Sequence, residues 1–124
     1  MWDGFDKRKF PRLKLNCQIE IQPQAKKAPA VTVTENVGVG GVCVIQNQPL
    51  ERFSLCRLRL ELQPNLPFID CTGKVVWIIE RREPMPRERR FDTGIEFVDI
   101  ASADRERIRA FIQENLSLNP SQEV

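Results

Sequence analysis

The chain has 124 residues, 41% hydrophobic and 29% charged, and its 19 basic and 17 acidic side chains give a net charge of +2. That length allows one modest hydrophobic core and excludes two domains, and the charge balance excludes a polycation built to coat DNA. No apolar run approaches the roughly 18 residues of a membrane span, and residues 1–8 hold no signal-peptide stretch, so we expect a cytoplasmic protein.

Histidine and tyrosine are both absent. The usual proton shuttle near neutral pH, histidine-based metal sites and Ser-His or Cys-His nucleophile pairs are therefore excluded, and we expect neither an enzyme nor a metal site. The cysteines stand far apart with no Cys-x-x-Cys pair, and each lies in a segment with strand character. We interpret them as reduced core thiols. They are Cys17, Cys43, Cys56 and Cys71.

The sequence divides into an arm, a folded domain and a tail. We expect residues 1–12 to form a flexible N-terminal arm, residues 13–116 the folded domain and residues 117–124 a frayed tail. Residues 13–22 alternate without interruption between apolar and polar side chains. This alternation predicts a half-buried antiparallel strand at the start of the domain.

Two further strands flank a glycine-rich segment. Residues 31–34 predict one strand, and the β-branched run over residues 42–45 predicts the next. Residues 36–41, Asn-Val-Gly-Val-Gly-Gly, lie between them and contain half of the six glycines. They predict a turn in which glycine permits positive φ and a close approach of backbone amides to a ligand.

Three more strands are predicted at residues 56–62, 68–80 and 91–98. The first of these stops before two prolines, which cannot donate to a strand ladder. The connection over residues 81–90 holds five arginines, two glutamates and two prolines, which predicts a solvated hairpin loop. Trp77 lies in a very apolar strand, so we expect it in the core, with a stacking platform on the ligand side as the alternative.

The end of the chain changes to a helical period. From Ser102, the expected N-cap, the apolar residues Ile108, Phe111, Ile112 and Leu116 recur at helical spacing,. Short antiparallel strands followed by one helix predict a small closed or nearly closed barrel, because closure removes exposed strand edges. The helix would cap one end of the barrel or lie across one side.

A basic pentapeptide stands just ahead of the first strand: Arg8-Lys9-Phe10-Pro11-Arg12. In an extended chain its two arginines stand roughly 13 Å apart, so they could grip different parts of one ligand. A guanidinium pairs with the Hoogsteen edge of guanine, clamps a phosphate or stacks on a base. Asn36 adds a donor and an acceptor at the mouth of the glycine turn. The alternatives are a solvated basic terminus and a turn that binds no ligand.

Together these features resemble the PilZ domain, the bacterial receptor domain for cyclic di-GMP. That family combines an Arg-x-x-x-Arg arm, an Asp/Asn-x-Ser-x-x-Gly turn, a Val-Val-Trp-like strand, a Gly-x-Glu-Phe strand and a final helix. The matching residues here are Arg8 and Arg12 in the arm, Asn36 and Gly41 in the turn, residues 75–77 and 94–97 in the strands, and Phe111 in the helix.

The resemblance implies a mainly β fold, a six-stranded antiparallel PilZ-like split barrel with a C-terminal helix, and no cofactor beyond the ligand itself. The arginine arm would fold over cyclic di-GMP seated on the barrel surface. The implied ligand-binding residues are Arg8, Arg12, Asn36, Gly38 and Gly41, with Lys9 and Trp77 as further candidates.

One position departs from the family pattern. Gly38 stands where the turn carries serine, so a hydroxyl expected to bond the ligand is missing. One lost hydrogen bond corresponds to an affinity lower by about twofold to 150-fold. Asn36 in place of aspartate also lacks a formal charge, although the family tolerates either residue.

The leading hypothesis is a non-enzymatic cyclic di-GMP receptor whose N-terminal arm becomes ordered on binding and so presents a new surface to a separate downstream protein. One alternative is a degenerate PilZ adaptor that acts through protein contacts alone, as the serine-to-glycine change would permit. A third hypothesis, suggested by the arginines of residues 81–90, is single-stranded nucleic-acid binding; we do not expect it to be the main function.

Overall fold

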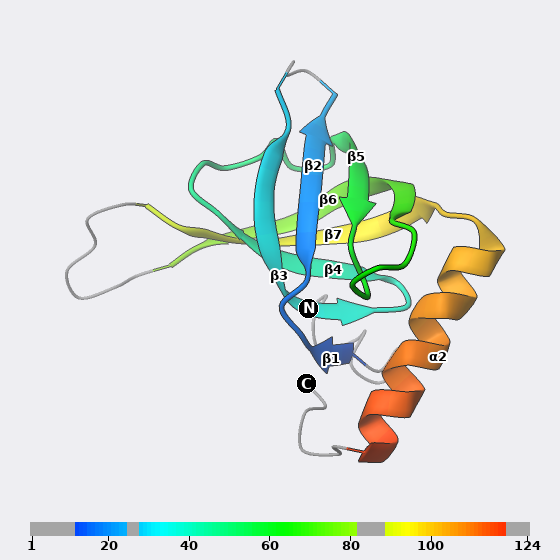
Figure 1. The fold of residues 1–124 in the computed structure, drawn as a ribbon. Helices are drawn as coiled ribbons and strands as arrows, with labels where there is room; N and C mark the ends of the chain where they lie inside the picture. The colour runs from blue at the N-terminus through cyan, green and yellow to red at the C-terminus, as the bar shows by residue number, and fades with distance from the viewer. Residues whose placement is uncertain (1–11, 25–27, 82–88, 119–124) are drawn as a thin grey trace.

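The computed structural model describes residues 12–24, 28–81 and 89–118. Its strands are β1 (Arg12–Lys14), β2 (Gln18–Pro23), β3 (Ala30–Gly38), β4 (Gly41–Gln46), β5 (Leu55–Leu60), β6 (Ile69–Glu80) and β7 (Phe91–Asp99), followed by helix α2 (Ser102–Leu118). The strands form one sheet in the order β1-β3-β2-β5-β6-β7-β4, and a further pairing between β3 and β4 closes it. Strands β2 to β7 therefore make a closed six-stranded antiparallel barrel (Figure 1), which confirms the fold predicted from the sequence. β1 is a short extra strand on β3.

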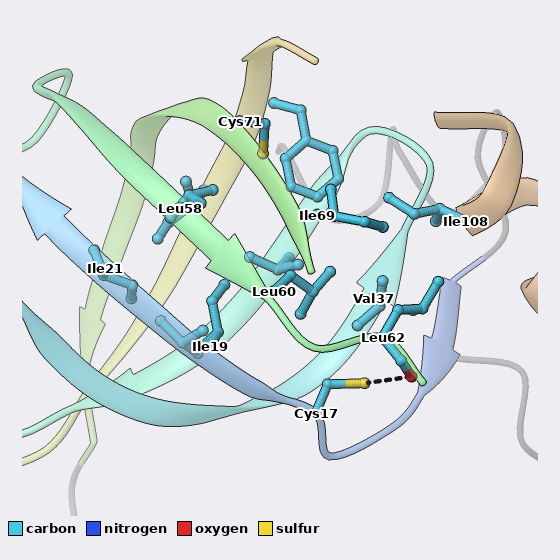
Figure 2. Packing of buried hydrophobic residues seen from close by; sticks show 14 of the residues in the cluster. Cys17, Ile19, Ile21, Val37, Leu58, Leu60, Leu62, Ile69, Cys71 and Ile108 are labelled. Carbon is cyan, nitrogen blue, oxygen red and sulfur yellow. Dashed lines mark hydrogen bonds between the residues drawn. The ribbon is translucent and has the colours of Figure 1, made fainter. Parts of the chain in front are cut away.

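The barrel encloses one hydrophobic core, to which every strand contributes alternate side chains. Figure 2 shows apolar residues of β2, β3, β5 and β6 meeting inside the barrel, with Ile108 of α2 against them. The most deeply buried of these, Ile21, Val37 and Ile69, have 0% of their surface exposed. Since each strand alternates between core and solvent, the residues between the core positions point outward and can form a binding surface.

The predicted strand over residues 13–22 is divided into β1 and β2. Its alternation holds, but Leu15, Asn16 and Cys17 leave the regular ladder because the buried Thr34 side chain enters it. The Thr34 hydroxyl donates to the Leu15 carbonyl at 2.6 Å and accepts from the Cys17 amide at 2.9 Å. The Asn16 amide group donates to the Thr34 carbonyl at 2.8 Å. Nothing in the strand's own pattern indicates this interruption, because it comes from a side chain of β3.

The strand pairings have three register shifts, one of them between Thr72 and Gly73, and the other two change which face a side chain of the candidate site occupies. In β3 the register with β4 shifts between Thr34 and Asn36, and in β6 the register with β7 shifts between Val75 and Trp77. A bulge inserts one extra residue, so the residues beyond it point to the opposite face from the one that strict alternation gives. The bulge in β3 lies beside the glycine turn, and the bulge in β6 lies beside Trp77. Both bulges therefore shape the candidate site.

Helix α2 packs against β1 and β3, beside the barrel as Figure 1 shows. Ile108 and Ile112 enter the core, and Phe111 and Leu116 pack against it, as the helical spacing predicted. Ser102 is not the N-cap: it is the first helical residue, and the Ala101 carbonyl accepts from the Arg105 amide at 3.0 Å,. The helix continues to Leu118, past the expected boundary at residue 116.

All four cysteines are free and buried. Cys17, Cys56 and Cys71 belong to the core cluster, as predicted, whereas the Cys43 thiol donates to Glu35 outside that cluster. Burial raises the pKa of Cys56 to about 11 and that of Cys71 to about 12, so both carry their protons at neutral pH. Within the described part of the chain, no three metal-ligating side chains gather in one place. No helix in that part has the length and apolar character needed to traverse a bilayer. The expected arm, apart from Arg12, most of the arginine-rich loop and residues 119–124 of the tail lie outside the described residues.

Candidate functional site on the barrel surface

The register of β1 brings the end of the basic arm to the glycine turn. Arg12 stands opposite Gly38, and Lys14 stands opposite Asn36. Between these pairs, the apolar side chains of Leu13 and Val37 are both 0% exposed and hold β1 against β3 from inside the barrel. The predicted proximity of Arg12 to the turn is therefore present in the backbone. Arg8 and Lys9 lie outside the described residues.

Asn36 occupies the outer face because of the bulge in β3. Strict alternation from the buried Thr34 would place Asn36 inward, but the extra residue, Glu35, shifts the phase so that Val37 enters the core instead,. The Asn36 Oδ1 atom is buried and has no hydrogen-bond partner among the described residues. A buried amide oxygen left without a donor is costly, so this atom is a ready acceptor for an N–H group of a ligand.

The turn at residues 39–40 is tied to two other elements through its carbonyls. Arg105 of α2 donates from Nη1 to the Val39 carbonyl at 3.2 Å, and the Phe97 amide donates to the Gly40 carbonyl at 2.9 Å. These bonds occupy the two carbonyls and fix the path of the turn. The sequence did not indicate Arg105 as a site residue, because its partner lies 66 residues away in the sequence.

The predicted use of positive φ in the turn is wrong, since none of the described glycines has a positive φ. What Gly41 supplies is a close approach between strands: a Cβ at Gly41 would lie 2.2 Å from the Ile95 carbonyl oxygen of β7. A side chain there would push β4 away from β7. The identity of Gly41 is thus explained by barrel closure, without a ligand.

Trp77 lies on the outer face, not in the core as first expected. The bulge near Val76 leaves Val75 and Ile78 facing the core and pairs Trp77 with Gly94. A Cβ at Gly94 would lie 2.2 Å from the indole Nε1 of Trp77, so the half-buried indole rests across the glycine. The ring lies on the same side of the barrel wall as Asn36.

Five residues form one lateral row across five strands. Pairings join β1 to β3, β3 to β4, β4 to β7 and β7 to β6. The row consists of Lys14, Asn36, Cys43, Gly94 and Trp77. Strands lie about 4.8 Å apart, so Asn36 and Trp77 are separated by three spacings, or about 14 Å. Cys43 and Gly94 lie between them, and this part of the row therefore has an amide at one end and an indole at the other.

An ion-pair cluster lies beside this row. Arg81 lies 2.7 Å from a Glu35 carboxylate oxygen through Nη2 and 2.9 Å from Asp92 through Nε. The Cys43 thiol donates to the other Glu35 oxygen at 3.5 Å. Burial, and then the negative charge of Asp92, raise the pKa of Glu35, and the Arg81 guanidinium opposes this shift without cancelling it. The cluster fixes the β3 bulge from outside; the sequence had assigned Arg81 to a solvated loop.

Comparisons with known proteins bear on the family and the fold of the chain. The family model described as "PilZ domain" matches residues 6–114. Among curated proteins, no sequence match was found.

Solved structures share the fold at low sequence identity. The Bacillus subtilis inhibitor of motility, MotI/DgrA, superposes with a TM-score of 0.74 and 19% identity, over 90% of this chain and 52% of that one. MrkH of K. pneumonia in complex with c-di-GMP gives 0.69 and 16%, over 92% and 54%. The PilZ domain of YcgR from Escherichia coli, with c-di-GMP, gives 0.67 and 11%, over 87% and 90%. The chain spans about half the length of MotI and of MrkH.

Proposed function

The chain belongs to the PilZ domain family, and on that premise we propose that it is a non-enzymatic receptor for cyclic di-GMP. The observation that carries the proposal is the register of β1, in which Arg12 stands opposite Gly38 and Lys14 opposite Asn36. Arg12 and Asn36, one from each of the two segments that resemble the family's ligand-binding motifs, therefore lie on adjacent strands. Two of the structures that share the fold, those of YcgR and MrkH, are described as complexes with c-di-GMP.

Each part of the ligand would meet a different group of the site. The dinucleotide has two guanines and two phosphates, and the guanidinium groups of Arg8 and Arg12 would bind guanine Hoogsteen edges and phosphates, with Lys9 as a further cation. Asn36 would accept from a guanine N–H through Oδ1, which has no partner among the described residues. Trp77 would stack on a base at the far end of the row, about 14 Å away by strand spacing.

The missing hydroxyl at Gly38 would weaken binding without removing the arm. The family's serine is replaced by glycine here, so the backbone of Gly38 and Gly41 remains as the support for a base edge. One absent hydrogen bond corresponds to about twofold to 150-fold in affinity. We therefore expect a larger dissociation constant than the same site would have with serine.

Signalling would follow from ordering of the chain that precedes β1. Ligand binding would fold residues 1–11 over the nucleotide and so present a new surface to a separate downstream protein, a population shift that needs no catalysis. The four free thiols suit a reducing compartment, which supports a cytoplasmic location,.

Calorimetric titration with cyclic di-GMP tests the proposal. We expect saturable heat from the parent chain and none from Arg12→Ala. Arg109→Ala is the matched control, because Arg109 is an exposed arginine on α2 whose side chain pairs with Glu106. Equal affinity in the parent and in Arg12→Ala would contradict the proposed site.

No heat and no chemical-shift change at about millimolar ligand, a very weak affinity limit, would favour the second candidate, a degenerate PilZ adaptor. The glycine at position 38 is the observation that keeps this candidate open.

A further inference from the structure

The outer side of β5 carries a second surface that nucleotide binding does not use. We call it the β5 face and define it by Phe53, Leu55, Arg57, Arg59, Phe68 and Lys74. Three of these side chains alternate along β5 with the buried Cys56, Leu58 and Leu60. In the closed barrel, β5 and β4 are three strands apart in either direction. The β5 face is therefore on the opposite side of the barrel from the strand that begins at Gly41.

Two exposed aromatic rings mark the ends of the β5 face. Phe53 is 59% exposed, and the guanidinium of Arg52 and the ammonium of Lys74 lie 4.8 and 5.8 Å from its ring centre. Phe68 is 44% exposed, with the guanidinium of Arg59 at 4.4 Å. Such cation–π contacts hold cations and rings together at the surface. Arginine and exposed aromatic residues are also the types enriched at the centres of protein interfaces.

The backbone holds Phe53 in a sparsely populated conformation. Its φ is 69°, in the left-handed region that a bulky side chain rarely adopts,. The Phe53 amide donates to the Val75 carbonyl at 2.7 Å, and the Val75 amide donates to the Ser54 carbonyl at 3.0 Å, so β6 fixes this geometry. An exposed ring is thus positioned by a strained backbone, which is typical of functional surfaces.

The β5 face is hollowed at two places. A cavity of about 410 Å³ is lined by residues that include Leu55, Arg57 and Thr72. A smaller one of about 140 Å³ is lined by residues that include Arg59 and Phe68. Each hollow therefore has an arginine and an apolar side chain in its wall. The wall of the smaller hollow also includes Glu20, whereas the wall of the larger one has no acidic side chain, so the larger hollow is the better place for a carboxylate of a partner.

The spacing of Arg57 and Arg59 indicates that the partner segment is extended. Arg57 and Arg59 are two residues apart on one strand, about 7 Å, which is also the spacing of alternate side chains in an extended peptide. β5 is paired on both edges, to β2 and to β6, so a partner cannot add to it as a new strand and must bind through side chains. Within the described residues Arg59 has an ion pair, with Asp70 at 3.7 Å, whereas Arg57 donates only to the Thr72 hydroxyl.

We propose that the β5 face is a docking site for an extended acidic segment of a partner protein, with carboxylates at alternate residues. Arg57 and Arg59 would bind those carboxylates, and Phe53, Leu55 and Phe68 would cover the apolar side chains between them. Glu20 and Asp70 flank Arg59 on either side in the sheet and weaken its attraction for any anion, whereas the uncharged Gln22 and Thr72 flank Arg57, so Arg57 is the stronger carboxylate site of the two,. The site is independent of the proposed nucleotide function.

Selection from a phage-displayed library of random peptides tests the proposal. The peptides are about 12 residues long, so that an extended peptide is longer than β5. We expect the enriched peptides to carry Asp or Glu at alternate positions. A synthetic peptide of the enriched sequence should bind at least about tenfold more weakly to the double variant Arg57→Gln/Arg59→Gln. The same peptide should change the amide chemical shifts of β5 in the parent chain. The matched control is the double variant Arg90→Gln/Arg109→Gln. Arg90 lies just before β7 and Arg109 lies on α2, and both are exposed. This variant should bind the peptide as the parent does.

Three results would overturn the proposal: no enrichment of acidic peptides, equal peptide affinity in the double variant, or a single-stranded thymidine oligonucleotide that binds the same residues in preference to the peptide at about 0.15 M salt. The last result would make the face a nucleic-acid site. Retained melting temperature in the double variant separates loss of docking from loss of fold. Titration of the same variant with cyclic di-GMP should give the parent's affinity, so failure of docking and failure of the nucleotide proposal are distinguishable.

Discussion

The indole of Trp77 occupies the space that a side chain on Gly94 would need. The two residues are paired across β6 and β7, and a Cβ on Gly94 would lie 2.2 Å from Nε1 and 2.3 Å from Cε2 of the ring. The position of the indole therefore requires a glycine at residue 94, and the indole in turn covers the backbone of β7 there. This pair forms the end of the row that begins at Lys14 and passes through Asn36.

Gly94→Ala should displace the indole from the barrel wall. Overpacking of this kind costs about 1–3 kcal/mol, so we expect the free energy of unfolding to fall by that amount in urea titrations. The indole N–H resonance of Trp77 should also shift. Glu96→Ala, an exposed outward position on the same strand, is the control and should change neither quantity. A Gly94→Ala chain with the parent's stability and indole shift would contradict the close contact.

Arg105 should act as a positioning residue for the nucleotide site. Its guanidinium holds the Val39 carbonyl from helix α2, so Arg105→Met leaves the turn free to move. We expect cyclic di-GMP affinity to fall by about fivefold, equivalent to ~1 kcal/mol, in calorimetric titration. Arg105→Lys, which keeps a donor, should recover part of the loss. An equal loss of affinity in Arg109→Met, on the exposed side of α2, would show that helix charge alone is responsible.

Gly38→Ser should restore the hydroxyl that the family pattern places in the turn. Position 38 stands opposite Arg12 in the ladder, so the new hydroxyl would lie beside the arm. We expect cyclic di-GMP affinity to rise by about tenfold, within the range for one added hydrogen bond. Gly38→Ala is the matched control, because it adds the Cβ without the hydroxyl. If both variants bind equally well, the hydroxyl is not the missing contact.

Glu35 should make stability depend on pH in the mildly acidic range. Burial and the Asp92 charge raise the pKa of Glu35 above its ordinary value of 4.5. The folded chain therefore binds this proton more tightly than the unfolded chain. The resulting stabilisation is fully present below pH 4.5 and is lost as the pH rises through the folded-state pKa,.

Glu35→Gln removes that titration while keeping the size of the side chain. We expect the variant to lose the part of the decline in unfolding free energy that begins above pH 4.5, measured by urea unfolding at successive pH values up to about 7. Glu114→Gln, an exposed position on α2, should keep the parent's profile. A Glu35→Gln profile parallel to the parent's would show that another group is responsible.

Much of the architecture follows from local patterns in the chain. Period-two alternation identified most of the strands, and the period of about 3.6 located Ile108 and Ile112 on the core side of α2. The order of motifs indicated the family, and the arm and glycine turn were expected to meet, as Arg12 and Gly38 do in the backbone. These features depend on neighbouring residues and on simple burial of apolar side chains, which a sequence displays directly.

Tertiary structure alone decided three features: the outward position of Trp77, the outward position of Asn36 and the hydrogen bond from Arg105 to Val39. The first two depend on bulges in β6 and β3, and a bulge is set by pairing with a partner strand far away in sequence,. One inserted residue reverses the face of every side chain beyond it until the next irregularity. Local alternation contains no record of that partner, so only the assembled barrel determines which residues border the site.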